Sequence, residues 1–177
     1  MRLDPKYFNL FIAICAGLTL VAIIFYTIRY SQTQIRDFRQ NMESVQADEL
    51  SFRSYTETDS LHISDLKGSP AVIQFWSTWS GKSHAVNIFL NDFKREHPDL
   101  QIVAAVVRDD ESLVLEYIKN HSYPFNFVDG TAFYQTVYVP GTPSQIFINS
   151  SGEYVDFNIG DDTEKLELKL TELLQNE

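Results

Sequence analysis

Two serines lie three residues apart where an apolar run ends and a helical pattern begins, in the stretch Trp79-Ser80-Gly81-Lys82-Ser83. A serine hydroxyl becomes a nucleophile when an adjacent base accepts its proton. His84 follows Ser83 directly, but successive side chains on a helix point about 100° apart, so this imidazole is not placed as a base. The Ser80 hydroxyl is instead suited to accept the N–H of Ser83 as a helix N-cap. We expect no serine chemistry here.

Residues with metal-binding or redox side chains do not gather elsewhere in the sequence. The single cysteine, Cys15, excludes an intrachain disulfide, a CxxC redox pair and any multi-cysteine metal site. The acidic clusters at 109–111 and 161–162 lack the alternating spacing of a calcium loop and precede helical patterns, so we expect them to cap helices. We predict no metal and no cofactor, because the histidines stand at unrelated spacings: His62, His84, His97 and His121.

The composition limits the class of protein. The chain has 177 residues, enough for one domain and an appendage, and its hydrophobic content of 44% excludes a disordered chain. There are 14 Lys and Arg against 24 Asp and Glu, a net charge of -10. Non-specific nucleic-acid binding needs a basic face that neutralises phosphates. We therefore predict no nucleic-acid partner.

Residues 8–27 form an uncharged, mostly apolar run of twenty positions. At about 1.5 Å per residue, a helix of this length spans roughly 30 Å, the thickness of a bilayer core. A signal peptide would have a shorter apolar core followed by a small-x-small cleavage site, which this sequence lacks. We predict a tail over 1–7 and a transmembrane helix over 8–29 that contacts membrane lipid.

A polar helical pattern follows over 30–49, the predicted juxtamembrane stalk, and its apolar residues are spaced three, four and three apart. Such a stripe packs either on the chain's own domain or the lipid surface, or on a partner subunit, and both alternatives stay open. A run of small side chains in the transmembrane helix would let a partner helix approach closely, although small residues are common in membrane helices generally. The candidate partner-helix contacts are Cys15, Ala16, Gly17, Ile35, Phe38, Met42 and Val45.

Residues 50–177 alternate between strand and helix patterns, which predicts an α/β domain. Continuous apolar runs such as AVIQFW and QIVAAVV indicate strands covered on both faces, hence a central sheet layered by helices. Further strand patterns are SFRSYT, FNFV, SQIFIN and EYVDFNI, and helical patterns cover 83–96, 110–120 and 163–175.

Two segments of this domain carry a family resemblance: 75–83 reads FWSTWSGKS, and 138–144 reads YVPGTPS before a predicted strand and a glycine turn. With the lead-in ISDLKGSPAVIQFW and the N-terminal anchor, they resemble the membrane-anchored thioredoxin-like proteins of the TlpA/ResA kind. The resemblance covers about residue 50 to the end and implies a thioredoxin fold, a central mixed sheet flanked by helices. It also implies that Thr142–Pro143 is a cis peptide that presents its backbone to an extended substrate, with both segments at one end of the sheet.

The redox motif of that family is degenerate in this chain. The family's two cysteines correspond to Ser80 and Ser83, and thiol–disulfide exchange requires sulfur at both positions. Lys82 stands where the family usually has proline, and Gln74 stands where thioredoxins keep a buried acid. These two departures favour natural decay over engineering, since removing two thiols gives no reason to change them. We expect a protein that is not an enzyme and has no catalytic residue.

These features predict a non-catalytic, membrane-anchored thioredoxin-like domain that is an accessory or scaffold subunit of a larger membrane protein complex. The expected location is a bacterial inner membrane, crossed once, with the domain on the periplasmic side; basic residues flank both ends of the apolar run, so charge bias does not set the orientation. An alternative is an assembly factor or chaperone that binds an extended peptide beside Trp79 and Pro143. A thiol–disulfide oxidoreductase requires that Ser80 and Ser83 be engineered replacements of cysteine.

Overall fold

The computed structural model describes residues 5–45 and 50–176. The predicted tail over 1–7 and stalk over 30–49 therefore lie partly outside the described residues. The chain divides into two compact units after Asp37, within the helix α1 (Pro5–Ser44).

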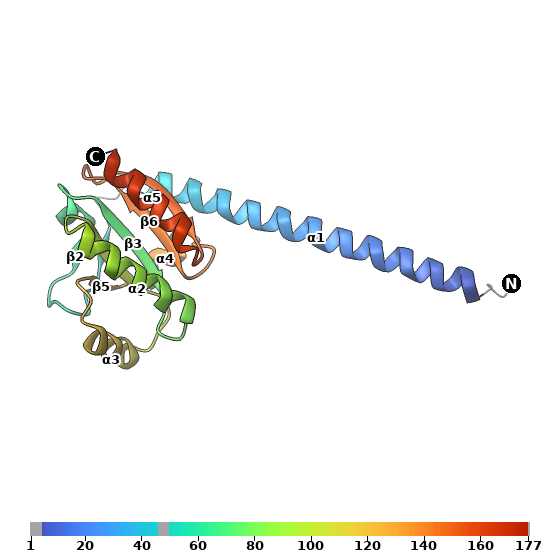
Figure 1. Ribbon diagram of the computed structural model, residues 1–177, viewed down its shortest axis with the longest axis horizontal. Coiled ribbons are helices and arrows are strands. Elements are labelled where there is room, and N and C mark those ends of the chain that lie inside the picture. The colour runs from blue at the N-terminus through green and yellow to red at the C-terminus, as the bar shows by residue number, and fades with distance from the viewer. Residues whose placement is uncertain (1–4, 46–49, 177) are drawn as a thin grey trace. The chain divides into compact units, whose positions relative to one another are not determined.

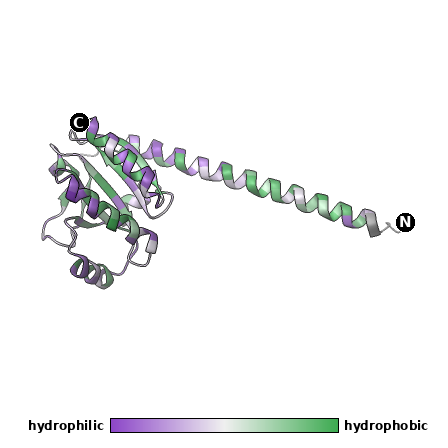
Figure 2. Cartoon of the chain, in the orientation of Figure 1, coloured by the Kyte–Doolittle hydropathy of each residue, from purple (hydrophilic) through white to green (hydrophobic). Residues whose placement is uncertain are grey.

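The first unit is the larger part of α1, and its apolar side chains are exposed. Figure 2 shows the apolar residues concentrated in the N-terminal half of this helix. The hydroxyls of Thr19 and Thr27 donate to the carbonyl oxygens of Cys15 and Ile23, at 2.9 and 2.8 Å, so these polar groups are satisfied within the helix. Among the described residues, α1 is long and apolar enough to cross a membrane. A signal sequence near an N-terminus meets the same criteria of length and composition.

The second unit is built on a five-stranded mixed sheet with the strand order β5-β4-β3-β6-β7 (Figure 1). The strands β3, β4 and β5 are parallel, whereas β6 and β7 run antiparallel to their neighbours. This is the mixed sheet that the resemblance implied. The bounds are β3 Ala71–Trp76, β4 Gln101–Val106, β5 Asn126–Asp129, β6 Ser144–Ile148 and β7 Tyr154–Ile159.

Helices and short segments cover both faces of the sheet (Figure 1). In β3, Val72 and Trp76 share a core with side chains of α2, α3 and α5. Ile73 and Phe75 on the opposite face share a core with η2, α4 and the last turns of α1. Because both faces are covered, β3 is buried along its whole length. The bounds are η2 Ile63–Leu66, α2 Gly81–Glu96, α3 Glu111–His121, α4 Thr131–Thr136 and α5 Thr163–Gln175.

The apolar stripe of the predicted stalk enters the domain's own core. Phe38 is fully buried, and its ring meets that of Phe157 edge to face at a centroid distance of 4.9 Å. Met42 is buried in the same core, Val45 packs against it, and Ile35 is exposed. The sequence left open whether this stripe packs on the chain's own domain or on a partner. Phe38 and Met42 pack in the domain's own core, so neither side chain is left for a partner helix. The compact unit accordingly begins at Phe38, before the predicted boundary.

Two short segments differ from the sequence prediction. The SFRSYT run is a strand only at β1 (Ser51–Phe52), which pairs with β2 (Leu61–His62), and the residues after β1 run along the edge of β5. The helix α4 was not predicted at all. Its buried Phe133 packs against the rings of Phe52 and Phe75, at centroid distances of 5.6 and 5.9 Å. Tertiary contacts therefore hold this short helix in place.

Candidate functional site

The degenerate motif lies between the end of β3 and the first turn of α2. Ser80 is the N-cap residue of that helix: the N–H of Ser83 donates to Ser80 Oγ at 3.2 Å, and the N–H of His84 donates to the Ser80 carbonyl oxygen at 3.1 Å. The capping role predicted from the sequence is confirmed. The hydroxyl satisfies one of the N–H groups that a helix N-terminus leaves without an intrahelical acceptor.

Ser83 is fully buried under the motif. Its Oγ accepts a hydrogen bond from the N–H of Ser77 at 3.4 Å, and Ser77 Oγ donates to the carbonyl oxygen of Val107 at 2.9 Å. The adjacent Thr78 hydroxyl donates to Asp109 Oδ1 at 2.9 Å. These bonds tie the start of α2 to the ends of β3 and β4. A buried hydroxyl with a partner is a stable occupant of this position, whereas it cannot replace sulfur in disulfide exchange.

Neither serine of the motif has a base beside it. In the part of the chain that the structure describes, no imidazole or carboxylate accepts a hydrogen bond from Ser80 or Ser83. The His84 ring lies against Tyr117, with 5.0 Å between the ring centroids, and Asn87 Nδ2 donates to Tyr117 Oη at 3.3 Å. Burial raises the pKa of Tyr117 to about 12, so its phenol is neutral at physiological pH. These neighbours do not activate a serine hydroxyl.

The second predicted segment lies at the same end of the sheet as the motif. The Thr142–Pro143 peptide bond is cis, as the resemblance implied. The strand β6 starts at Ser144, directly opposite Phe75 near the end of β3. Each segment exposes one large aromatic side chain, since Trp79 and Tyr138 are both 71% exposed. This end of the sheet therefore presents aromatic surface together with the backbone of the cis-proline loop.

A third loop, 160–162, forms hydrogen bonds with both the degenerate motif and the cis-proline loop. The N–H of Gly160 donates to the carbonyl oxygen of Pro143 at 2.9 Å, and Lys82 Nζ donates to the Asp161 carboxylate at 2.9 Å. The hydrogen bond from Lys82 lowers the pKa of Asp161. Both side chains of this pair are substantially exposed, so the ion pair adds little to stability. Its effect is to direct Lys82, at the position of the family's proline, toward this loop.

Each of the two acidic clusters contributes one helix cap, as the sequence predicted. Asp110 Oδ1 accepts from the N–H of Ser112 at 2.8 Å at the start of α3. Asp162 Oδ1 accepts from the N–H of Lys165 at 3.1 Å at the start of α5. The hydrogen bonds from Ser112 hold the pKa of Asp110 below its ordinary value. Asp110 and Asp162 therefore have a structural role at helix N-termini.

A row of three buried amides crosses the sheet, and sequence reasoning missed it. Gln74 on β3, Gln145 on β6 and Asn158 on β7 are in register and buried. Asn158 Nδ2 donates to Gln145 Oε1, and Gln145 Nε2 donates to Gln74 Oε1, each at 2.7 Å. Each amide interrupts an apolar strand pattern, which is the signal that could have indicated their pairing. The row carries no charge, and it includes Gln74, the position to which the resemblance assigns the buried acid of thioredoxins.

The remaining predicted contact residues belong to the first unit. Cys15, Ala16 and Gly17 are exposed on α1, and a Cβ at Gly17 would have nothing within 4 Å. As for metals, the described ranges contain no group of three His, Cys, Asp or Glu side chains that could hold an ion.

Replacement of Ser80 by alanine is expected to lower the free energy of unfolding by about 1 kcal/mol, because the Ser83 N–H loses its capping acceptor. Ser80→Asp should keep wild-type stability, since a carboxylate accepts the same bond and interacts favourably with the helix dipole. Denaturant-induced unfolding of both variants measures the difference. Equal stability of the alanine and aspartate variants would contradict the capping role.

No protein-family model matches this sequence. The thiol-disulfide oxidoreductase ResA of Bacillus cereus is 27% identical over 113 residues, which are 62% of this chain and 65% of that protein, slightly less than two thirds of its length. Among solved structures, MTB dsbF has a TM-score of 0.62 at 22% identity and covers 73% of this chain and 98% of its own. A thiol:disulfide interchange protein DsbE from Chlorobium tepidum has a TM-score of 0.65 at 19% identity, over 73% and 95% of the two chains. StoA from Bacillus subtilis has a TM-score of 0.55 at 19% identity, over 67% and 93%. The chain therefore has the thioredoxin fold and is similar to thiol-disulfide oxidoreductases of the ResA, DsbE and StoA kind.

Proposed function

We propose that this protein is a membrane-anchored thioredoxin-like domain without thiol chemistry that serves as an accessory or scaffold subunit of a larger membrane protein complex. The structure of the motif carries this proposal: Ser80 caps α2 and the buried Ser83 binds the N–H of Ser77. The sequence has one cysteine, Cys15, which lies on the apolar part of α1. A domain that keeps the fold but not its nucleophile is suited to binding other proteins.

We place the chain in a bacterial inner membrane, crossed once by residues 8–29, with the domain on the periplasmic side. The exposed apolar length of α1 supports the crossing. The similarity to disulfide interchange proteins supports the side, because disulfide exchange of this kind belongs to compartments outside the reducing cytosol. The net charge of -10 agrees with a domain that touches an anionic membrane only through its anchor.

The purified protein is expected to reduce insulin disulfides no faster than the protein-free buffer containing the same reductant. The physical reason is that a serine hydroxyl cannot form the mixed disulfide. The matched control is the double variant Ser80→Cys/Ser83→Cys, which restores sulfur at both positions and leaves the rest of the motif unchanged. Turnover by the wild-type chain above the buffer rate would contradict the proposal.

The full chain is expected to stay in the membrane fraction after high-salt and carbonate washes. Its attachment is hydrophobic, and ions do not screen burial of apolar surface. A fragment that begins at residue 31 should be soluble and folded. Immunoblots of the washed pellets and supernatants measure the distribution, and release of the full chain by salt alone would show that the helix is not a membrane span.

A second candidate function is an assembly factor or chaperone that binds an extended peptide. It is supported by the exposed side chains of Trp79 and Tyr138 on the segments that meet beside the cis Pro143. The scaffold and chaperone functions predict different behaviour of partner proteins when this chain is purified. A scaffold subunit should co-purify stoichiometrically with a detergent-solubilised complex, whereas a chaperone should capture clients transiently and lose them on Trp79→Ala substitution.

A further inference from the structure

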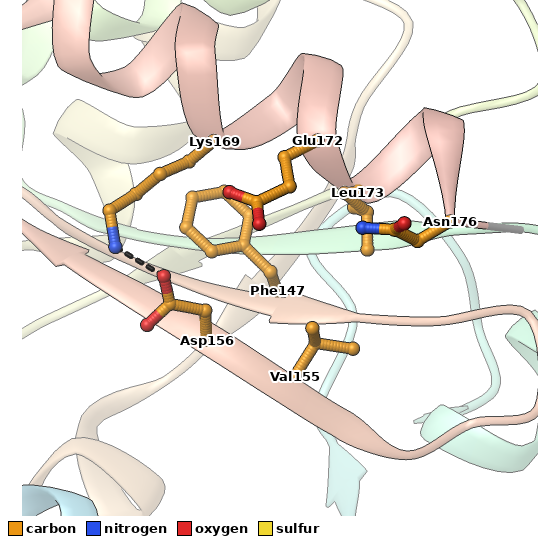
Figure 3. Close-up of a pocket in the computed structure, with 7 residues that line it drawn as sticks. All are labelled: Phe147, Val155, Asp156, Lys169, Glu172, Leu173 and Asn176. Atoms are coloured by element: carbon orange, nitrogen blue, oxygen red, sulfur yellow. Dashed lines mark hydrogen bonds and ion pairs between the residues drawn. The ribbon is translucent and has the colours of Figure 1, made fainter.

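A pocket of about 200 Å³ opens between α5 and the edge strand β7 (Figure 3). It lies toward the end of β7 away from the degenerate motif. Ile159 pairs with Ser144 at the motif end of the sheet, whereas Tyr154, next to the pocket residue Val155, pairs with Ile148 at the opposite end. The pocket is therefore separate from the surface that the cis-proline loop forms.

The floor of the pocket is apolar. Phe147 and Leu173 line it and are 1% and 4% exposed, and Val155 beside them is 49% exposed. A volume of this size holds one long side chain and is below the range of about 300–1,000 Å³ that is typical of small-molecule sites. The floor thus suits an aliphatic stem that a larger partner inserts.

Of the charged groups that the structure describes around this floor, some have an ion-pair or hydrogen-bond partner and one does not. Lys169 is paired with Asp156 and donates to the carbonyl oxygen of Phe157 at 2.8 Å. Glu172 also lines the pocket, one turn along α5 from Lys169 (Figure 3). Within the described ranges, its carboxylate has neither a hydrogen bond nor an ion pair. The pocket therefore keeps one negative charge available to a cation.

The edge of β7 is protected against pairing with another strand. The Lys169 ammonium donates a hydrogen bond to the Phe157 carbonyl oxygen, which is then not available to an added strand. The register shift at Phe147 leaves Val155 as the extra residue of a β-bulge. Lysines and bulges at sheet edges both oppose strand addition. A partner of this surface therefore engages the pocket with a side chain and not with its backbone.

We propose that this pocket binds an arginine side chain presented by a basic segment of a partner protein. The aliphatic stem packs on the floor formed by Phe147 and Leu173, and the guanidinium pairs with Glu172. Arginine fits better than lysine because its guanidinium is weakly hydrated and lies readily against apolar and aromatic surface. The net charge of -10 on the chain adds long-range attraction for a basic partner.

This inference goes beyond the proposed function and is independent of it. Neither membrane anchoring nor the loss of thiols enters the geometry of the pocket. Disulfide reductase activity in the wild-type chain would end the proposed function and leave the pocket unaffected, while loss of arginine binding would leave the proposed function unaffected.

The test is an NMR titration of the ¹⁵N-labelled full chain in detergent micelles with N-acetyl-argininamide. We expect saturable shifts of the backbone amides of Val155, Glu172 and Leu173. N-acetyl-citrullinamide has the same shape without the charge and should bind about two- to fivefold more weakly, as expected for loss of one exposed ion pair. Equal binding of the two probes, or shifts spread over the whole acidic surface, would overturn the proposal.

Two variants on α5 locate the binding. Glu172→Gln should weaken binding of N-acetyl-argininamide by about two- to fivefold and leave binding of the citrulline probe unchanged. Glu167→Gln removes the same charge from an exposed position of α5 outside the pocket and should bind like the wild type. If the two variants bind the arginine probe equally, Glu172 is not the receiving group and the assignment fails.

Discussion

A Phe38→Ala substitution is expected to lower the free energy of unfolding of the domain by about 3–5 kcal/mol, the range for removing a large buried aromatic side chain. The Phe38 ring is fully buried and packs edge to face on Phe157 at 4.9 Å. Its loss leaves a cavity where the last turns of α1 meet β7 and removes an aromatic pair. Urea unfolding of a fragment covering 31–177, with and without the substitution, measures the change.

The matched control for this prediction is Ile35→Ala on the same stripe of α1. Ile35 is 37% exposed and belongs to the first unit. Its truncation should change the free energy of unfolding by no more than about 0.5 kcal/mol. A fragment that starts at residue 46 should be destabilised at least as much as the Phe38→Ala variant, because it lacks both Phe38 and Met42. Equal effects of the two alanine substitutions would contradict the burial of Phe38 in the domain core.

A Gln74→Glu substitution is expected to make stability fall steeply as pH rises. Gln74 is fully buried in the amide row, and burial raises the pKa of a glutamate above its ordinary value of about 4.3. Above that pH the unfolded variant has released a proton that the folded variant still holds. Stability is then lost with increasing pH, by at most about 1.4 kcal/mol per unit, until the raised pKa is reached. Urea unfolding between about pH 4 and pH 8 measures the slope.

Gln74→Met provides the control, because it loses the hydrogen bond from Gln145 without adding a titratable group. Its free energy of unfolding should be lower than that of the wild type by a similar amount at every pH. The difference between the two variants therefore isolates the cost of charge at this position. Parallel pH profiles for the glutamate and methionine variants would show that the position is accessible to water.

Much of the fold could be predicted because the long elements carry their own patterns. The AVIQFW run is β3, and the helical pattern over 83–96 is α2, which begins slightly earlier at Gly81 because Ser80 caps it. The helix α4 has 6 residues, too few for a periodicity to be seen, and depends on the rings of Phe52 and Phe75 from other segments. The stalk stripe predicted a helix face, but the sequence could not indicate that β7 covers it.

The same distinction holds for the candidate site. The Ser80 cap was predictable because donor and acceptor lie in one helical turn. Gln145 and Gln74 are 71 positions apart, and Lys82 and Asp161 are 79 apart. These contacts depend on strand register and loop placement, which no local pattern specifies. Polar groups that interrupt apolar strands were visible in the sequence, but their partners were not.

The serines of the motif also make this domain insensitive to the redox potential around it. A dithiol site exists in two covalent forms, and the surrounding potential selects between them. Here Ser80 and Ser83 hold the start of α2 with the same hydrogen bonds under oxidising and reducing conditions, and the second unit contains no cysteine. A protein bound at this end of the sheet therefore meets one covalently constant surface, whatever the supply of oxidant or reductant.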